Sequence, residues 1–142
     1  LYAAWGSRGD DASLCAPSEE DGAAVIPRLR MDGRAVFRFA TEILPACTQK
    51  VLERAGLDIA QVDRFVFHQA NQRIVDLAVK KLGADPKRCG GNIARTGNTS
   101  AASVAILLDE LCRTGALASG GRALCVGFGA GLTWAGALLE RA

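Results

Sequence analysis

The stretch that decides the fold is RFVFHQANQRIVDLAVKKLG, residues 64–83. Its first five residues are rich in aromatic and β-branched side chains, which favour a short strand. From residue 71 the apolar residues recur at helical spacing, which predicts an amphipathic helix. Lys80 and Lys81 fall in the last turn of that helix, and Gly83 is a typical stop. The inward face is expected to carry Ile74, Val75, Ala78, Val79 and Leu82.

Helical spacing also occurs on both sides of this stretch. Upstream, residues 33–55 predict a long helix that ends at Gly56. Pro45 lies inside it and has no backbone N–H to donate, so we expect a kink or a division there. Downstream, NTSAASVAILLDELCRTG (98–115) predicts another helix with Gly115 as its stop. The candidates for its N-cap are Asn98, Thr99 and Ser100.

Three further segments favour strands. CGGNIA (89–94) is expected to be a short one, and RALCVGF (122–128) and LTWAGALLE (132–140) are longer runs joined by a glycine-rich turn. The two longer runs are apolar on successive residues, which is typical of strands covered on both faces. Alternating strands and helices predict an α/β fold over residues 31–142. Residues 1–30 are rich in Gly, Ser and acidic residues and are expected to form an irregular lead-in.

The composition limits the functional classes. The chain has 142 residues, 49% hydrophobic and 23% charged, as expected for one globular domain with its own core. A net charge of +2 without a Lys/Arg cluster gives no support for nucleic-acid binding. No apolar run has the length of a membrane span, so no membrane partner is expected. Because the chain begins at Leu1, we expect it to be a piece of something longer.

Five cysteines, an odd number without C-x-x-C spacing, accompany a single histidine. This makes a zinc site improbable, and no metal is expected. None of the cysteines lies at an obvious helix N-terminus, where a thiolate would be stabilised. We therefore expect structural thiols in a reducing compartment, which is a cytoplasmic setting.

Candidate functional residues occur where strands end. His68 and Asn98 lie at two such junctions, and the turn at residues 128–131 is a third. Ligands of open α/β sheets bind beyond the carboxyl ends of strands, so parallel strands would bring His68 and Asn98 together. Taken singly, each has a simpler interpretation: a hydrogen-bonded core histidine, a helix cap, and glycines needed for positive φ. Asn71 and Arg73 can likewise be solvated residues of a first helical turn.

Taken together, three motifs resemble one family. HQANQRI (68–74), GNTSAAS (97–103) and GFGAGLTWAGAL (127–138), in this order, resemble the C-terminal half of β-ketoacyl-[acyl carrier protein] synthase III. MDGRAVFRFATEILP (31–45) resembles the helix that leads into that half. The resemblance implies one half of a thiolase-like fold, with a mixed five-stranded sheet and helices packed on its faces. It is weaker over residues 1–30.

The family's reaction, a decarboxylative Claisen condensation in fatty acid or related polyketide biosynthesis, is implied as well. Its substrates are acyl-CoA and malonyl-acyl carrier protein, and no cofactor is implied. His68 and Asn98 match the family's pair that stabilises the enolate formed when CO₂ leaves. Phe128, Gly129 and Ala130 match the turn that lines the pocket and offers a backbone N–H to an oxyanion. The segment matching the family's carrier-protein and pantetheine contact comprises Gln69, Ala70, Asn71, Gln72 and Arg73.

One element of the family is missing from this sequence. The family's nucleophilic cysteine lies in a small-residue motif of the N-terminal half, and no such motif occurs here. The resemblance thus implies an incomplete, inactive chain whose partners are CoA thioesters, acyl carrier protein and an N-terminal half on the same or another chain. The full enzyme is expected to be a homodimer. The alternative is a non-catalytic module for dimerisation or carrier-protein docking, with His68 and Asn98 as relics.

Overall fold

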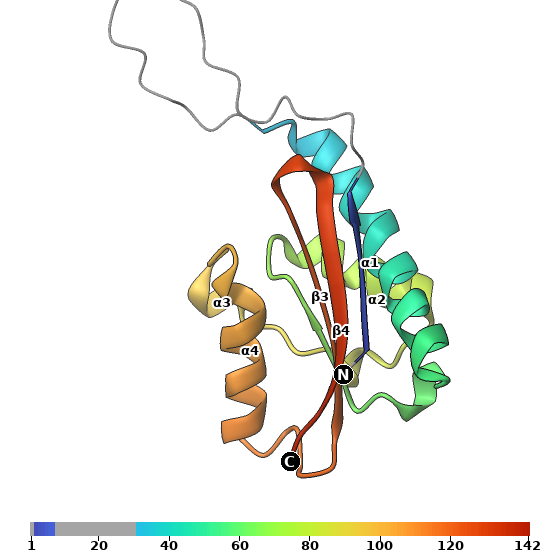
Figure 1. Cartoon of the computed structure of the whole chain (residues 1–142). Coiled ribbons are helices and arrows are strands. Elements are labelled where there is room, and N and C mark those ends of the chain that lie inside the picture. Colours follow the sequence, from blue (N-terminus) through green and yellow to red (C-terminus); the bar gives the residue numbers. More distant parts are fainter. Residues whose placement is uncertain (1, 8–30) are drawn as a thin grey trace, which may run out of the picture.

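A mixed sheet forms the centre of the molecule (Figure 1), whose computed structural model describes residues 2–7 and 31–142. Strand β2 (Arg64–Phe67) pairs in parallel with β3 (Arg122–Gly129). Strand β4 (Thr133–Glu140) returns antiparallel to β3, and β1 (Tyr2–Ser7) adds antiparallel to β4. Within the described residues the sheet therefore has four strands, in the order β1–β4–β3–β2.

The prediction of a strand at residues 89–94 is wrong, and within the described residues the sheet has four strands in place of the five that the resemblance implied. Cys89 forms one isolated parallel bridge with Phe65, and the N–H of Gly90 donates to the Phe65 carbonyl at 3.2 Å. The chain then leaves the sheet and enters the short helix α3 (Ile93–Thr96). Two consecutive glycines, Gly90 and Gly91, have no side chains to pack in a strand, which explains why pairing stops after one residue.

Strand β1 also differs from the expectation. Residues 1–30 were predicted to be irregular, whereas Tyr2–Ser7 pairs with β4 from Leu138 to Thr133. An unpaired β4 would present a row of N–H and C=O groups, and β1 satisfies them. Residue 1 and residues 8–30, including Cys15, lie outside the described part of the chain.

Helices cover the sheet from both sides. Helices α1 (Gly33–Ala55) and α2 (Gln72–Leu82) lie on one face, and α4 (Ala102–Arg113) lies on the other (Figure 1). The larger core lies between the sheet and the α1/α2 pair and includes Leu44, Phe67 and Ile74. The smaller core lies under α4 around Val66 and Leu107. The prediction of an α/β fold with helices packed on both faces of the sheet is confirmed, although α4 covers its face only in part.

The ends of the helices follow local sequence signals. The Asp32 side chain accepts hydrogen bonds from the N–H groups of Arg34 and Ala35 and so caps α1. Gly56 and Gly83 end α1 and α2 with φ of 64°. Short 3₁₀ turns cover Ile59–Gln61, Pro86–Arg88 and Ala130–Leu132.

Pro45 does not divide α1, which runs unbroken through 23 residues. Its ring removes the N–H that would bond the carbonyl of Thr41, four residues earlier. The Nζ of Lys81, from the last turn of α2, donates to that carbonyl at 3.0 Å. A neighbouring helix thus replaces the hydrogen bond that proline removes. No helix within the described residues is long and apolar enough to cross a membrane.

Candidate functional site

His68 follows β2 directly and is held by both its backbone and its ring. Its N–H donates to the carbonyl of Val126 at 2.9 Å, which continues the parallel pairing one residue past the strand. Its Nδ1 lies 2.5 Å from the hydroxyl of Ser103 in α4. Its ring meets Phe128 edge-on, with 5.0 Å between the ring centroids. Burial lowers the pKa of His68, so the imidazole is neutral at pH 7.

Asn98 lies in the loop between α3 and α4. Its Oδ1 accepts the N–H of Ser100 at 2.9 Å, and a backbone N–H requires an oxygen there, which settles the orientation of the amide. The Nδ2 group remains as a donor on the other side. The predicted N-cap at Asn98, Thr99 or Ser100 is wrong, because α4 begins later, with Ala101 at the N-cap position. Asn98 stabilises a local turn instead, as asparagine commonly does in loops.

One cavity joins the three segments that were predicted to follow strands, although Asn98 follows the short helix α3 instead. It has a volume of about 400 Å³, and its lining includes His68, Asn98, Phe128, Gly129 and Ala130. β2 and β3 are parallel, so both end at the same edge of the sheet, and the Asn98 loop closes over that edge. The expectation that His68 and Asn98 meet is therefore confirmed as geometry. Their chemical roles remain predictions.

The segment after His68 divides into buried and exposed residues. Gln69 is fully buried, which corrects its expected part in a surface contact; its side chain bonds the Phe67 carbonyl and the Asn92 N–H. Ala70 is half-buried, and Asn71 caps α2 by accepting the N–H of Arg73 at 2.9 Å. The Arg73 side chain is exposed at the start of the helix. Only part of the segment is thus available to a partner.

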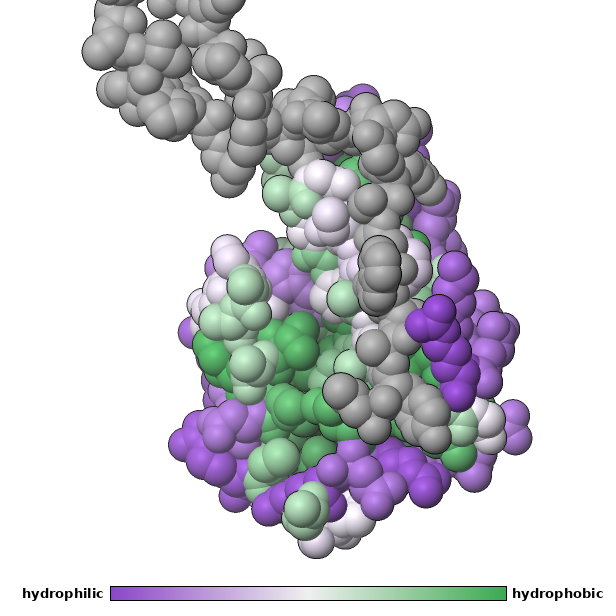
Figure 2. Space-filling model, in the orientation of Figure 1, coloured by the Kyte–Doolittle hydropathy of each residue, from purple (hydrophilic) through white to green (hydrophobic). Residues whose placement is uncertain are grey.

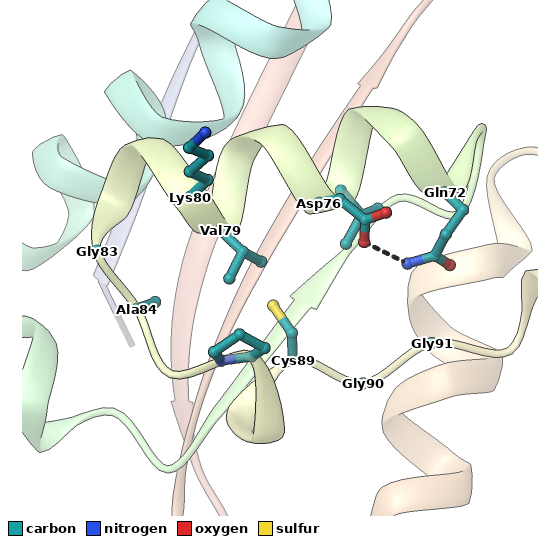
Figure 3. A pocket seen from close by; sticks show the side chains of 11 residues that line it. Gln72, Asp76, Val79, Lys80, Gly83, Ala84, Cys89, Gly90 and Gly91 are labelled. Atoms are coloured by element: carbon teal, nitrogen blue, oxygen red, sulfur yellow. Dashed lines mark hydrogen bonds between the residues drawn. The ribbon is translucent and has the colours of Figure 1, made fainter.

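A second cavity of about 530 Å³ lies beside α2 and the loop that follows it (Figure 3). Gln72, the remaining residue of the predicted contact segment, points into it and donates to Asp76 Oδ1 at 2.9 Å. Cys89 lies on the opposite wall, and burial raises the pKa of its thiol to about 12. This cavity holds no activated nucleophile.

Two further described cysteines, Cys47 and Cys125, are also buried thiols. Burial raises the pKa of both Cys47 and Cys125 to about 11, so these thiols stay protonated at neutral pH. A thiol is nucleophilic as its thiolate, so neither is prepared to accept an acyl group. The prediction of structural thiols holds for Cys47, Cys89 and Cys125.

The α4 face of the sheet is only partly covered. A shallow apolar depression lies beside α4, and Figure 2 shows hydrophobic residues gathered there. Its lining includes Val104 of α4, Gly127 of β3, and Ala135 and Ala137 of β4. The depression and the His68 cavity share Val104, Gly127 and Phe128, so the apolar face continues into the candidate site.

A sequence model of the C-terminal part of 3-oxoacyl-[acyl-carrier-protein (ACP)] synthase III matches residues 52–141. The chain belongs to this family. The match contains both His68 and Asn98 and the turn around Ala130.

Full-length synthase III relatives extend well beyond this chain. The beta-ketoacyl-[acyl-carrier-protein] synthase III of Desulfitobacterium hafniense (strain DSM 10664 / DCB-2) is 44% identical over 128 residues, covering 90% of this chain and 39% of that protein. The chloroplastic synthase III of Arabidopsis thaliana is 43% identical over 112 residues, covering 79% and 28%. The chain thus spans less than half the length of these curated relatives.

Solved structures of similar proteins also extend well beyond this chain. The synthase III of Thermus thermophilus superposes with a TM-score of 0.89 at 40% identity, covering 99% of this chain and 46% of that one. A priming β-ketosynthase from the R1128 polyketide pathway gives 0.86 at 41% identity, covering 98% and 44%. The synthase III domain described here is therefore one half of a thiolase-like fold. The homology supports the family assignment made from three short motifs.

Ser103 was absent from the sequence-based set of site residues. It lies within GNTSAAS (97–103), where a small residue is explained by close packing alone. Its contact with His68 joins residues 35 positions apart and needs the folded chain to be seen.

Proposed function

We propose that this chain is the C-terminal half of a 3-oxoacyl-[acyl carrier protein] synthase III, which condenses an acyl thioester with malonyl-acyl carrier protein. The observation that carries the proposal is the cavity that has a neutral histidine and an oriented asparagine amide in its wall. Both groups can donate a hydrogen bond to one oxygen without first losing or gaining a proton. The named activity of the relatives supports the same assignment.

The proposed step begins with the malonyl thioester in this cavity. The bond between the carboxylate carbon and Cα breaks, CO₂ leaves, and the electron pair moves onto the thioester oxygen as an enolate. His68 and Asn98 stabilise the developing negative charge through N–H donors that are already in place. The Cα then attacks an acyl thioester held on a cysteine, and the cysteine leaves as a thiolate. A backbone N–H near Ala130 serves the oxyanion formed in this second step.

The acyl acceptor belongs to the half that this chain does not contain. The three described cysteines with raised pKa values are unsuited to the role. The exposed apolar depression beside α4 suits the packing of an N-terminal half against this sheet face. On this proposal the chain alone is inactive, and turnover requires both halves, assembled as a homodimer in the cytoplasm.

The carrier protein is proposed to approach the start of α2. Arg73 is exposed there, and the helix N-terminus adds a positive potential that suits acidic or phosphate groups. The Oδ1 of Asn71 is used as the helix cap, which leaves its amide NH₂ to meet the phosphopantetheine arm. Gln69 has no part in this surface because it is buried.

The test is CO₂ release from malonyl-acyl carrier protein by the complete synthase. His68→Ala and Asn98→Ala are each expected to lower the rate on the order of 10²–10³-fold, the usual loss for one oxyanion donor. Gln49→Ala, on the exposed side of α1, is the control and should keep the wild-type rate. Wild-type rates in both site variants would refute the assignment. Carrier-protein binding without CO₂ release from the wild type would favour the non-catalytic docking module instead.

A further inference from the structure

Ser103 occupies a buried position between two parts of the candidate site. It is the second residue of α4, and its side chain is 1% exposed. Its Oγ lies 2.5 Å from His68 Nδ1 and accepts the backbone N–H of Gln69 at 3.3 Å. The hydroxyl therefore contacts the ring of His68 and the peptide that follows it.

The proton of this hydroxyl decides which nitrogen of His68 carries hydrogen. A serine hydroxyl has one proton and two acceptor lone pairs, and the Gln69 N–H occupies one lone pair. Within residues 31–142, Nδ1 is the one acceptor that the structure places within reach of the hydroxyl proton. If Nδ1 carried the hydrogen, Ser103 would accept twice and its own proton would be buried without a partner, which is unfavourable. The hydroxyl therefore donates to Nδ1, and the hydrogen of the neutral ring lies on Nε2.

The side chain of Gln69 fixes the peptide whose N–H meets Ser103. This side chain is fully buried, donates to the Phe67 carbonyl at 2.8 Å and accepts the Asn92 N–H at 3.1 Å. These two bonds tie the end of β2 to the loop that precedes α3. The Gln69 N–H that meets Ser103 is thus part of a rigid turn rather than of a freely moving loop.

We propose that Ser103 is a positioning residue that keeps His68 in its Nε2–H form, with that N–H on the side of the ring away from α4. His68 lines the cavity and Ser103 lies behind it, so the donor is available to a ligand there. The consequence for catalysis rests on the proposed function, whereas the tautomer itself depends only on contacts within this chain. Ser103 acts through His68 and touches no reacting atom.

His68 is the only histidine of the chain, so its ring nitrogens can be observed without assignment. We expect the nitrogen NMR spectrum of the 142-residue chain, labelled with ¹⁵N-histidine, to show a protonated Nε2 and an unprotonated Nδ1. Ser103→Ala should mix the two tautomers, Ser103→Thr should restore the wild-type spectrum through its hydroxyl, and Ser119→Ala, an exposed serine, should leave it unchanged. An Nδ1–H wild type, or an unaltered tautomer in folded Ser103→Ala, would overturn the proposal.

A second measurement keeps the two proposals separate. In the complete synthase, Ser103→Ala is expected to lower kcat for CO₂ release roughly 10-fold, less than the loss for removing the donor itself, with KM unchanged and activity recovered in Ser103→Thr. If His68 carries its hydrogen on Nε2 but the complete synthase shows no turnover, the role of Ser103 is supported and the proposed function is contradicted. Wild-type kcat in Ser103→Ala overturns the positioning role. If Ser103→Ala does not fold, the wild-type spectrum and the Ser103→Thr variant still decide the question.

Discussion

Gly136 of β4 packs directly against α1, and replacing it by alanine tests that packing. A Cβ at this position would lie 2.5 Å from Cys47 Sγ and 3.0 Å from Val51 Cγ2, both on α1. Neither side chain can easily move: Cys47 and Val51 are fully buried, and valine is restricted to one rotamer in a helix. We expect the helix and the sheet to be forced apart locally.

The magnitude follows from two opposing effects. Overfilling a packed core costs about 1–3 kcal/mol. Replacing a strand glycine by alanine gains about 0.5–1 kcal/mol, because the unfolded chain loses conformational freedom. Gly136→Ala is therefore expected to lower the free energy of unfolding by about 1–2 kcal/mol. Gly127→Ala is the matched control, because no atom lies within 4 Å of its added Cβ, and it should be neutral or slightly stabilising.

The assay is urea unfolding of the chain in reducing buffer, followed by circular dichroism and analysed by linear extrapolation. A second substitution identifies the contact responsible. Cys47→Ala removes the nearest atom, so the double variant Cys47→Ala/Gly136→Ala should be more stable than the sum of the single effects by about 1 kcal/mol. Equal stabilities of Gly136→Ala and Gly127→Ala, or strictly additive effects, would show that the close approach is not the cause.

Three other predictions concern individual side chains. Because burial lowers the pKa of His68, the unfolded chain binds a proton at this residue more readily than the folded chain. The free energy of unfolding should therefore be highest above the ordinary histidine pKa of about 6.5 and should decrease as the pH falls from there through the lower folded pKa. Urea midpoints from pH 8 to 5 should fall less in His68→Gln. Lys81→Met leaves the Thr41 carbonyl without its donor and should cost about 1 kcal/mol, whereas Lys80→Met should cost little; equal urea midpoints would argue against the replacement bond. Cys89, whose thiol pKa burial raises to about 12, should react with iodoacetamide far more slowly in the native chain than in urea, as peptide mass spectrometry can measure; equal rates would contradict its burial.

Local signals were sufficient for the bounds of α1 and α2. The spacing of Ile74, Val75 and Val79 and the glycine at Gly83 depend only on neighbours within a turn, so α2 was predicted to within a residue. The place of His68 at the carboxyl end of β2 could also be predicted, because ligand sites of open α/β sheets lie beyond the carboxyl ends of parallel strands. The family motifs then linked His68 with Asn98, and the structure places both in one cavity.

The errors have both distant and local causes. Nothing near Gln69 shows that its amide turns inward to meet Asn92, 23 residues later. Asn98 has the composition of a helix cap, yet its turn ends before α4 begins. The CGGNIA segment forms one isolated bridge and no strand, because its two consecutive glycines have no side chains to pack. The Gln69 contact depends on tertiary packing, which periodicity does not encode, whereas the other two outcomes follow from local alternatives to the predicted element.

The bond between Lys81 and the Thr41 carbonyl also fixes the position of one positive charge of α2. Lys80 and Lys81 are adjacent in sequence, but the ammonium of Lys81 is committed to a backbone oxygen of α1. Because a neutral carbonyl does not cancel the charge of an ammonium group, an acidic partner approaching α2 would be attracted by Arg73, Lys80 and Lys81, all of which are exposed. The ionic-strength dependence of such an association should consequently respond to replacement of any of these three residues, and replacement of Lys81 should lower thermal stability as well.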